Sequence, residues 1–347
     1  MSDPERPSPR AVIFGCAGPR LSDPEALFFA AAEPAGFILF DRNCRDPGQV
    51  RDLVAALRAC IGRPHAPVLI DQEGGRVARL GPPHWRNLPA AGRIGALAQG
   101  DAELGREAAW TVARLIAADL QPLGITVDCA PVLDVPAPGA HGIIGDRAIG
   151  PTPKLAADLG RAFCEGLLAG GVIPVIKHIP GHGRATVDSH AGLPIVDAAR
   201  EALEQADFAP FRALADMPWA MTAHILYRAL DARLPATTSP AVIGEVIRGA
   251  IGFDGVLVSD DLSMEALSGT PGERAAAALA AGCDLVLHCN ASHPEMEEVA
   301  AATPPVSATA RARLSRAEAM REPPQEADAT ALAARLHFLM GEAAAIG

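Results

Sequence analysis

Short apolar runs recur along the chain and alternate with longer segments of helical periodicity. Eight of these runs predict buried strands, at residues 11–16, 36–40, 67–70, 125–129, 172–176, 219–222, 255–258 and 284–288. Helical patterns lie between most of them, at residues 46–60, 101–120, 154–169, 198–215, 239–250 and 271–281. Because strands that alternate with helices form parallel sheets, and eight such units within about 290 residues match its usual size, the pattern predicts a (β/α)₈ barrel.

A doubly wound open sheet is the competing architecture, but no GxGxxG follows the first apolar run. Residues 307–347 are rich in Ala, Arg and Glu, and they predict helices packed on the barrel with one break at Pro323-Pro324. The sequence contains no obvious linker or repeat. We therefore expect an α/β fold of the TIM-barrel type, with residues 1–347 forming a single catalytic domain.

Composition narrows the class of protein further. Of the 347 residues, 49% are hydrophobic, and the net charge is −11, which argues against general binding to nucleic acid or to anionic membranes. The seven cysteines form no CxxC pair, as expected for reduced thiols. Residues 1–10 are polar, and no apolar run approaches the roughly 18–20 residues of a membrane span. These features predict a cytoplasmic protein without a membrane or nucleic-acid partner.

The richest chemistry follows the fifth predicted strand. The sequence KHIPGHG occupies residues 177–183, and DSH follows at residues 188–190. In an extended segment, side chains two residues apart face the same way, so Asp188 and His190 can touch. A carboxylate beside an imidazole fixes its tautomer and stabilises the imidazolium. The pair therefore predicts a proton-transfer group.

Carboxylates also follow other predicted strands. Asp71 begins the segment DQEGGRVAR at 71–79, where it can accept hydrogen bonds from ligand hydroxyls while one of the two arginines of the segment holds it or adds a second polar anchor. Asp260 and Asp261 end the seventh strand, and neighbours on a strand point in opposite directions. We expect Asp260 to face the barrel axis as a nucleophile, metal ligand or electrostatic stabiliser, and Asp261 to cap a following helix.

The same residues also allow two other functions, a zinc site and a Schiff base. His178, His182 and His190 could bind zinc, although Pro180 prevents a regular helix across the first pair. Lys177 could form a Schiff base, as in an aldolase-type lyase, although its polar neighbours favour an ordinary ammonium that binds hydroxyls.

An ordered set of motifs resembles glycoside hydrolase family 3, and within it the bacterial single-domain β-N-acetylglucosaminidases of peptidoglycan recycling. The matching segments are GFILF at 36–40 with Arg42-Asn43, DQEGGR at 71–76, APVLDV at 130–135, IGDR at 144–147, KHIPGHG at 177–183, DSH at 188–190, Ala223-His224, GFDG at 252–255 and SDDLSM at 259–264. One departure is Ile179, where relatives often have an aromatic residue. The second α/β domain of many family members would not fit within this chain.

The resemblance implies a (β/α)₈ barrel and double displacement with retention of configuration. Asp260 would be the nucleophile, and His190, paired with Asp188, would be the general acid and base. The positions that would bind the N-acetylglucosamine (GlcNAc) unit are Asp71, Arg79, Arg147, Lys177 and His178.

The expected activity is exo-β-N-acetylglucosaminidase, acting on GlcNAc linked to 1,6-anhydro-N-acetylmuramic acid with or without peptide. The resemblance implies no cofactor and no metal, and a monomer is favoured. A phosphorylase using the same covalent intermediate is the nearest alternative. A sugar-binding protein without catalysis is disfavoured because binding alone requires neither Asp260 nor the pair of Asp188 and His190.

Overall fold

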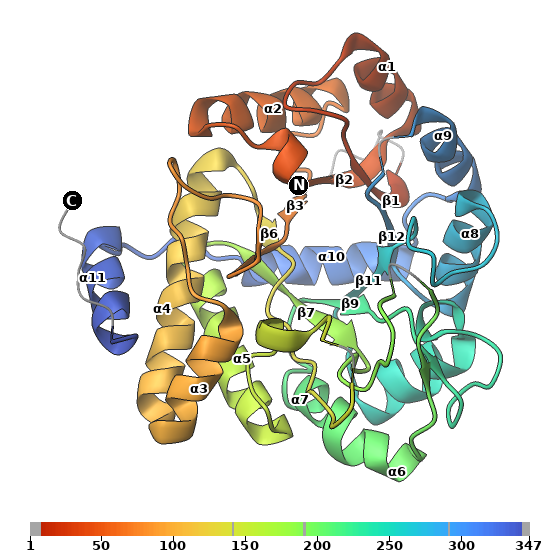
Figure 1. Cartoon of the computed structure of the whole chain (residues 1–347). Coiled ribbons are helices and arrows are strands. Elements are labelled where there is room, and N and C mark those ends of the chain that lie inside the picture. The colour runs from red at the N-terminus through yellow and green to blue at the C-terminus, as the bar shows by residue number, and fades with distance from the viewer. Residues whose placement is uncertain (1–7, 141, 190–191, 291, 342–347) are drawn as a thin grey trace.

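The computed structural model describes residues 8–140, 142–189, 192–290 and 292–341. Its centre is a closed barrel of parallel strands in the order β1-β12-β11-β9-β7-β6-β3-β2 (Figure 1). The barrel strands are β1 (Arg10–Gly15), β2 (Pro34–Leu39), β3 (Val68–Ile70), β6 (Val127–Asp128), β7 (Ile173–Ile179), β9 (Trp219–Thr222), β11 (Val256–Asp261) and β12 (Leu285–His288). Each of the eight predicted runs overlaps one of these strands, so the predicted (β/α)₈ barrel is confirmed.

Two strands extend further than the apolar pattern indicates. β7 continues through Lys177 and His178 to Ile179, and β11 continues through Asp260 to Asp261. Backbone pairing continues at these positions, since Ile179 pairs with Thr222 and Asp261 pairs with Leu287. The polar side chains at these ends therefore belong to the strands themselves.

Helices surround the barrel. They are α1 (Asp23–Ala32), α2 (Pro47–Cys60), α3 (Ala91–Gly100), α4 (Ala102–Leu120), α5 (Pro153–Ala169), α6 (Arg200–Ala202), η4 (Leu203–Asp207), α7 (Phe208–Ala213), η6 (Val242–Ala250), α8 (Pro271–Ala281), α9 (His293–Ala302), α10 (Ala308–Met320) and α11 (Ala329–Leu339). Short 3₁₀ turns are η1 (Asp41–Asn43), η2 (Gln121–Leu123), η3 (Gly145–Arg147) and η5 (Ala236–Thr238). The predicted helix at 198–215 divides into α6, the π-helical η4 and α7, and η6 is also π-helical.

Local sequence explains where several of these helices begin. The side chain of Asp46 accepts a hydrogen bond from the backbone N–H of Gln49 at the start of α2, and Thr152 caps α5 in the same way. Thr270 and Glu273 form a reciprocal capping box at the start of α8. Proline follows each of these caps, where its missing N–H costs no helical hydrogen bond.

The core has two layers because each barrel strand is buried on both faces. Side chains such as Ile13, Leu69, Val175 and Val258 fill the barrel interior. A second cluster lies between the strands and the helices that surround them. Burial on both faces explains why the strands read as continuous apolar runs without alternating polar positions.

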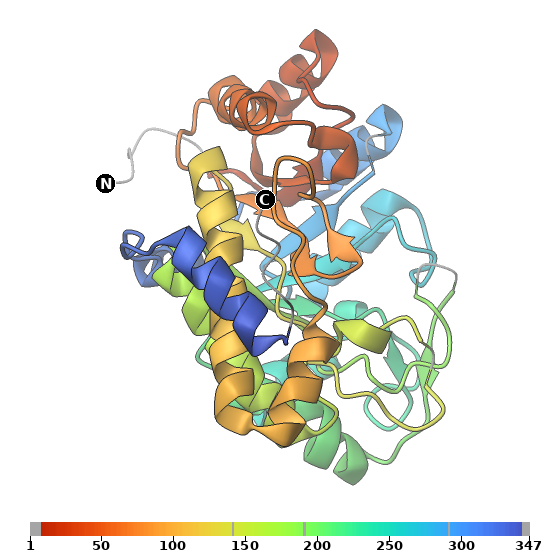
Figure 2. The same cartoon turned by 60° about the vertical axis from the view of Figure 1, so that its left-hand side comes forward.

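The C-terminal helices differ in where they pack. α11 lies outside the barrel along α4 (Figures 1 and 2). α10 instead crosses the barrel at the amino ends of the strands, where Ala310 and Ala317 join the cluster that fills the barrel interior. Of the two helices, α11 thus lies on the outside of the barrel, whereas α10 closes one end.

Two small sheets lie beyond the barrel. β4 (Gln72–Gly74) and β5 (Val77–Ala78) form an antiparallel hairpin after β3, and β8 (Ile195–Val196) pairs with β10 (Leu226–Tyr227). Among the helices of the described residues, none is long and apolar enough to span a membrane.

Candidate active site

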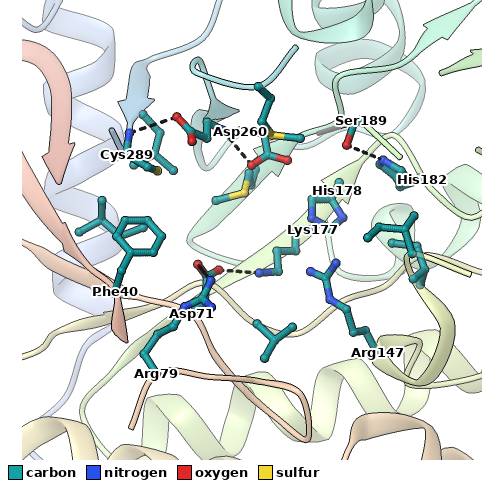
Figure 3. A pocket seen from close by; sticks show the side chains of 18 of the residues that line it. Phe40, Asp71, Arg79, Arg147, Lys177, His178, His182, Ser189, Asp260 and Cys289 are labelled. Atoms are coloured by element: carbon teal, nitrogen blue, oxygen red, sulfur yellow. Dashed lines mark hydrogen bonds and ion pairs between the residues drawn. The ribbon is translucent and has the colours of Figure 1, made fainter. Parts of the chain in front are cut away.

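A cavity of about 210 Å³ opens at the carboxyl ends of the barrel strands (Figure 3). Apolar side chains, among them Ile38, Met221 and Leu287, line part of it, and charged side chains line the rest. This is the face on which (β/α)₈ barrels carry their active sites. The sequence-predicted residues Asp71, Arg79, Arg147, Lys177, His178 and Asp260 all line this cavity.

Asp71 is held between two cations. Lys177 Nζ donates to Asp71 Oδ1 at 2.8 Å, and Arg79 Nη2 donates to Asp71 Oδ2 at 3.2 Å. Burial alone would raise the pKa of Asp71, but the charges of Lys177 and Arg79 outweigh it and hold that pKa below its usual range. Asp71 is therefore an ionised acceptor at the cavity wall, suited to sugar hydroxyls, and Arg79 is the arginine of its segment that supports it.

Glu73 is a buried member of the same cluster that the sequence interpretation missed. Its Oε1 lies 2.7 Å from Lys177 Nζ and 2.7 Å from Arg147 Nη2, while Oε2 accepts from Arg147 Nε at 2.9 Å. Burial would raise the pKa of Glu73, but the charges of Lys177 and Arg147 lower it. The available signal was its place two residues after Asp71 in the segment DQEGG.

The environment of Lys177 does not suit a Schiff base. Burial would lower the pKa of its ammonium group, but the two carboxylates of Asp71 and Glu73 raise it above its ordinary value. A Schiff-base lysine attacks as a free amine, which needs a lowered pKa. Lys177 is thus a permanent cation and hydrogen-bond donor, as its polar neighbours in the sequence indicate.

The Gly74-Gly75 turn brings this hairpin close to the loop before α3. Gly74 has φ +90°, and a Cβ there would lie 2.5 Å from the carbonyl oxygen of Pro89. Gly75 has φ +59°, and its Cβ would lie 2.6 Å from that of Ala90. Only glycine satisfies both the left-handed backbone and the close approach. The glycine pair therefore lets the chain turn directly after Glu73.

Asp134 supports two histidines at the cavity. His178 Nδ1 lies 2.7 Å from Asp134 Oδ2, and the backbone N–H groups of His178 and His182 donate to Oδ1 at 3.1 and 2.6 Å. Because an ionised carboxylate only accepts, His178 carries its proton on Nδ1. Burial, followed by the charge of His178, lowers the pKa of His182 to about 4. Among the described residues no group of metal-binding side chains occurs, and His190, the third histidine of the possible zinc site, lies outside them.

Asp260 and Asp261 both line the cavity, so the expectation that only one could face inward is wrong. The pairing register of β11 with β12 shifts between Val258 and Asp261, which interrupts the regular alternation of side chains. Lys177 and His178 likewise both line the cavity, where β7 shifts register against β9.

Asp261 does not begin a helix, contrary to the expectation. Its side chain accepts hydrogen bonds from Ser263 and from the backbone N–H of Cys289, which ties β11 to the end of β12. Its backbone carbonyl oxygen lies 3.0 Å from His224 Nε2. Asp261 therefore fixes the backbone beside Asp260.

Asp260 is the carboxylate of the cavity with the fewest hydrogen-bond and ion-pair partners among the described residues. It accepts a hydrogen bond from the backbone N–H of Asp261 at 2.8 Å, and within the described part of the chain it forms no salt bridge. Burial would raise its pKa, but the charges of His178 and His224 lower it. The group is thus ionised and faces the cavity without a bound cation, as a carboxylate nucleophile requires (Figure 3).

The predicted proton-transfer pair is described only in part. Asp188 is half-buried, whereas His190 lies outside the described residues, so their contact stays a prediction. Ser189 between them is buried, and its Oγ lies 3.4 Å from His182 Nε2 (Figure 3).

A cavity at the carboxyl end of a (β/α)₈ barrel, lined by ion pairs around Asp71 and by the ionised carboxylate of Asp260, is the arrangement expected of a glycosidase barrel. The chain belongs to glycoside hydrolase family 3, whose N-terminal domain matches residues 20–316. It is 43% identical over 288 residues to a β-hexosaminidase of Alkalilimnicola ehrlichii, covering 82% of this chain and 81% of that protein. It is 40% identical over 282 residues to a β-hexosaminidase of Methylococcus capsulatus, covering 80% and 82%.

Solved structures agree with this membership. NagZ from Neisseria gonorrhoeae in complex with N-trifluoroacetyl-D-glucosamine superposes with a TM-score of 0.85 at 32% identity, covering 96% of this chain and 98% of that one. A family 3 β-N-acetylglucosaminidase from Paenibacillus sp. superposes with a TM-score of 0.78 at 34% identity, covering 97% and 63%. The chain is thus a glycoside hydrolase, a β-N-acetylhexosaminidase, and the phosphorylase alternative is not favoured.

Proposed function

We propose that this hydrolase is a retaining exo-β-N-acetylglucosaminidase that removes terminal GlcNAc from muropeptides during cell-wall recycling. Its substrates are GlcNAc linked to 1,6-anhydro-N-acetylmuramic acid, with or without peptide. The observation that carries the proposal is the ionised Asp260 carboxylate, which shares a small cavity with the polar cluster around Asp71 and Lys177.

The size and the lining of the cavity support exo action. Its volume of about 210 Å³ is below the usual range for drug-sized ligands, which suits one sugar unit better than a chain. The ion pairs around Asp71 offer donors and acceptors for hydroxyl groups, while Met221 and Leu287 offer apolar surface. A terminal GlcNAc enters such a cavity, and the rest of the substrate stays outside.

In the first step, Asp260 attacks the anomeric carbon as the bond to the leaving sugar breaks. His190 gives its proton to the leaving oxygen, and a glycosyl ester on Asp260 remains. In the second step, neutral His190 takes a proton from water as the water oxygen attacks the anomeric carbon, which releases Asp260 and GlcNAc with retained configuration. Asp188 orients the imidazole and stabilises its charged form.

The role of Asp71, Arg79, Arg147, Lys177 and His178 in this scheme is to bind the GlcNAc unit. The enzyme works as a cytoplasmic monomer without a metal or cofactor. Free thiols at all seven cysteines support the cytoplasmic location.

The first test is hydrolysis of p-nitrophenyl β-N-acetylglucosaminide by the wild type and by Asp260→Asn. We expect turnover in the wild type without added phosphate and a fall of at least about 10³-fold in kcat for the variant. Asp158→Asn, at an exposed position on α5, is the matched control and should keep full activity. Undiminished activity of Asp260→Asn would refute its role as the nucleophile.

The substrate class needs a separate comparison. The wild type should cleave GlcNAc–anhydro-N-acetylmuramic acid, with and without peptide, at a higher kcat/KM than the disaccharide of two GlcNAc units. A preference for the GlcNAc disaccharide would leave the hydrolase intact and overturn the muropeptide assignment.

A further inference from the structure

We propose that Glu73 is a positioning residue of this enzyme, which holds two sugar-binding cations, Lys177 and Arg147, in their places at the cavity wall. Glu73 does not line the cavity itself and would act only through these two side chains. The inference rests on the hexosaminidase activity of the chain and is independent of its natural aglycone.

Three segments that are distant in sequence meet at Glu73. Glu73 lies in β4, Lys177 in β7 and Arg147 in η3. Both carboxylate oxygens are engaged, since Oε1 lies 2.7 Å from each cation and Oε2 accepts from Arg147 Nε at 2.9 Å. The exposed fractions of the three side chains are 4% for Glu73, 2% for Lys177 and 13% for Arg147. A buried bidentate pair of this kind fixes the plane of the guanidinium as well as its distance.

The two cations depend on Glu73 to different degrees. Lys177 also contacts Asp71, whereas in the described part of the chain the guanidinium of Arg147 donates to Glu73 alone. Lys177 and Arg147 repel each other, and the charge of Arg147 acts to lower the pKa of Lys177. Without the shared carboxylate, Arg147 would lose its anchor and move away from Lys177.

A second pair joins the same two segments farther out. Arg76, from the turn of the hairpin, donates to Asp146 at 3.0 Å, next to Arg147 in η3. These side chains are 45% and 53% exposed, and ion pairs at such positions contribute little. The outer pair therefore cannot replace Glu73, and the buried contact decides where Arg147 lies.

The test measures KM and kcat for p-nitrophenyl β-N-acetylglucosaminide in the wild type and Glu73→Gln. Glutamine keeps the size of the side chain but removes the charge and turns an amide N–H₂ toward a cation. We expect kcat/KM to fall about 10- to 100-fold, the usual effect of losing a partner that orients a ligating group, with most of the change in KM. Glu73→Asp, which keeps the charge, should recover part of the loss.

Asp284→Asn is the matched control for a buried carboxylate. Asp284 accepts from Arg248 and Arg313, each at 2.9 Å, at the amino end of β12, far from the cavity. This variant should lose thermal stability and keep the KM of the wild type. An equal rise in KM for Asp284→Asn would show that the effect of Glu73→Gln is general destabilisation.

A double-mutant cycle with Arg147→Met distinguishes positioning from a separate structural role. If Glu73 acts through Arg147, Glu73→Gln should cost much less in the Arg147→Met background than in the wild type. Additive effects, or a KM of Glu73→Gln within about twofold of the wild type, would overturn the proposal. Should Glu73→Gln fail to fold, Glu73→Asp in the same cycle gives the answer. An inactive wild type would instead refute the hexosaminidase activity.

Discussion

At the scale of single residues, Asp134 organises the histidine side of the cavity. It is fully buried and accepts hydrogen bonds from the imidazole of His178 and from the backbone N–H groups of His178 and His182. Burial alone would raise the pKa of Asp134, but the charge and hydrogen bond of His178 lower it to about 2. A buried carboxylate with this set of donors stabilises the fold only while it is ionised.

The stability that Asp134 contributes therefore depends on pH. Its pKa is about 2 in the folded chain against an ordinary value of 3.8, which corresponds to about 2 kcal/mol near neutral pH. Because the folded-state pKa is the lower one, this contribution is complete above about pH 4 and disappears as the pH falls toward about 2. We expect Asp134→Asn to lower the free energy of unfolding by about this amount near neutrality, measured by urea denaturation.

Repeating the urea denaturation at acidic pH tests the role of the Asp134 charge more directly. The difference between the wild type and Asp134→Asn should shrink as the pH falls below about 4. A difference that stays constant from neutral pH to acid would show that Asp134 acts by packing or hydrogen bonding without its charge.

At the scale of elements, the hairpin of β4 and β5 joins the barrel to the cavity wall. It carries Glu73 toward the two cations, and its Gly74-Gly75 turn lies against the loop that contains Pro89. Gln72 within it donates to the carbonyl oxygen of Leu80 and receives a hydrogen bond from the backbone N–H of the same residue. The contacts of the three residues of β4 thus fix the position of the segment after Asp71.

Gly74→Ala should disturb this element selectively. A methyl group at φ +90°, 2.5 Å from the carbonyl oxygen of Pro89, would force the hairpin to shift. We expect a loss of about 1–3 kcal/mol in the free energy of unfolding, together with a lower kcat/KM because Glu73 moves as well. Gly81→Ala is the control, since a Cβ there meets nothing within 4 Å and its backbone is not left-handed. Equal losses in both variants would contradict the steric explanation.

At the scale of the whole molecule, the barrel has one open and one closed end. The carboxyl ends of the strands surround the cavity, whereas α10 covers the amino ends. Arg313 and Arg316 of α10 pair with Asp254, two residues before β11, and Arg313 also contacts Asp284 before β12. These contacts fasten the helix across the barrel at the end opposite the cavity. Residues that stabilise the closed end therefore lie apart from those that line the cavity.

This division predicts that the closed end affects stability without affecting catalysis. Ala317 is 2% exposed against the barrel interior, so Ala317→Glu would bury an unpaired charge and lower the free energy of unfolding by at least about 3 kcal/mol. Ala319→Glu, at an exposed position of the same helix, should be nearly neutral. Below the melting temperature, both variants should show the KM of the wild type. A raised KM in the folded Ala317→Glu variant would show that the two ends are coupled.

Some features of the fold and of the site follow from local sequence patterns, and others do not. Each barrel strand overlaps a predicted apolar run, because a strand buried on both faces is mostly apolar. A pairing of Asp71 with one of the two arginines of its segment could be predicted because they lie close in sequence, and the structure shows that Arg79 is that arginine. The role of Asp261 could not, because it depends on a contact with Cys289, which is distant in sequence.

The sequence by itself therefore determined the barrel, its cavity face and most of the charged side chains at that face, since each follows from periodicity or from motifs a few residues long. Only the tertiary structure decided that Glu73 joins Lys177 to Arg147, that Asp134 holds two histidines and that α10 closes the barrel. Each of these depends on groups brought together by folding from segments far apart in the chain. No local sequence pattern predicts these contacts, because burial and charge pairing depend on which distant segments the fold brings together.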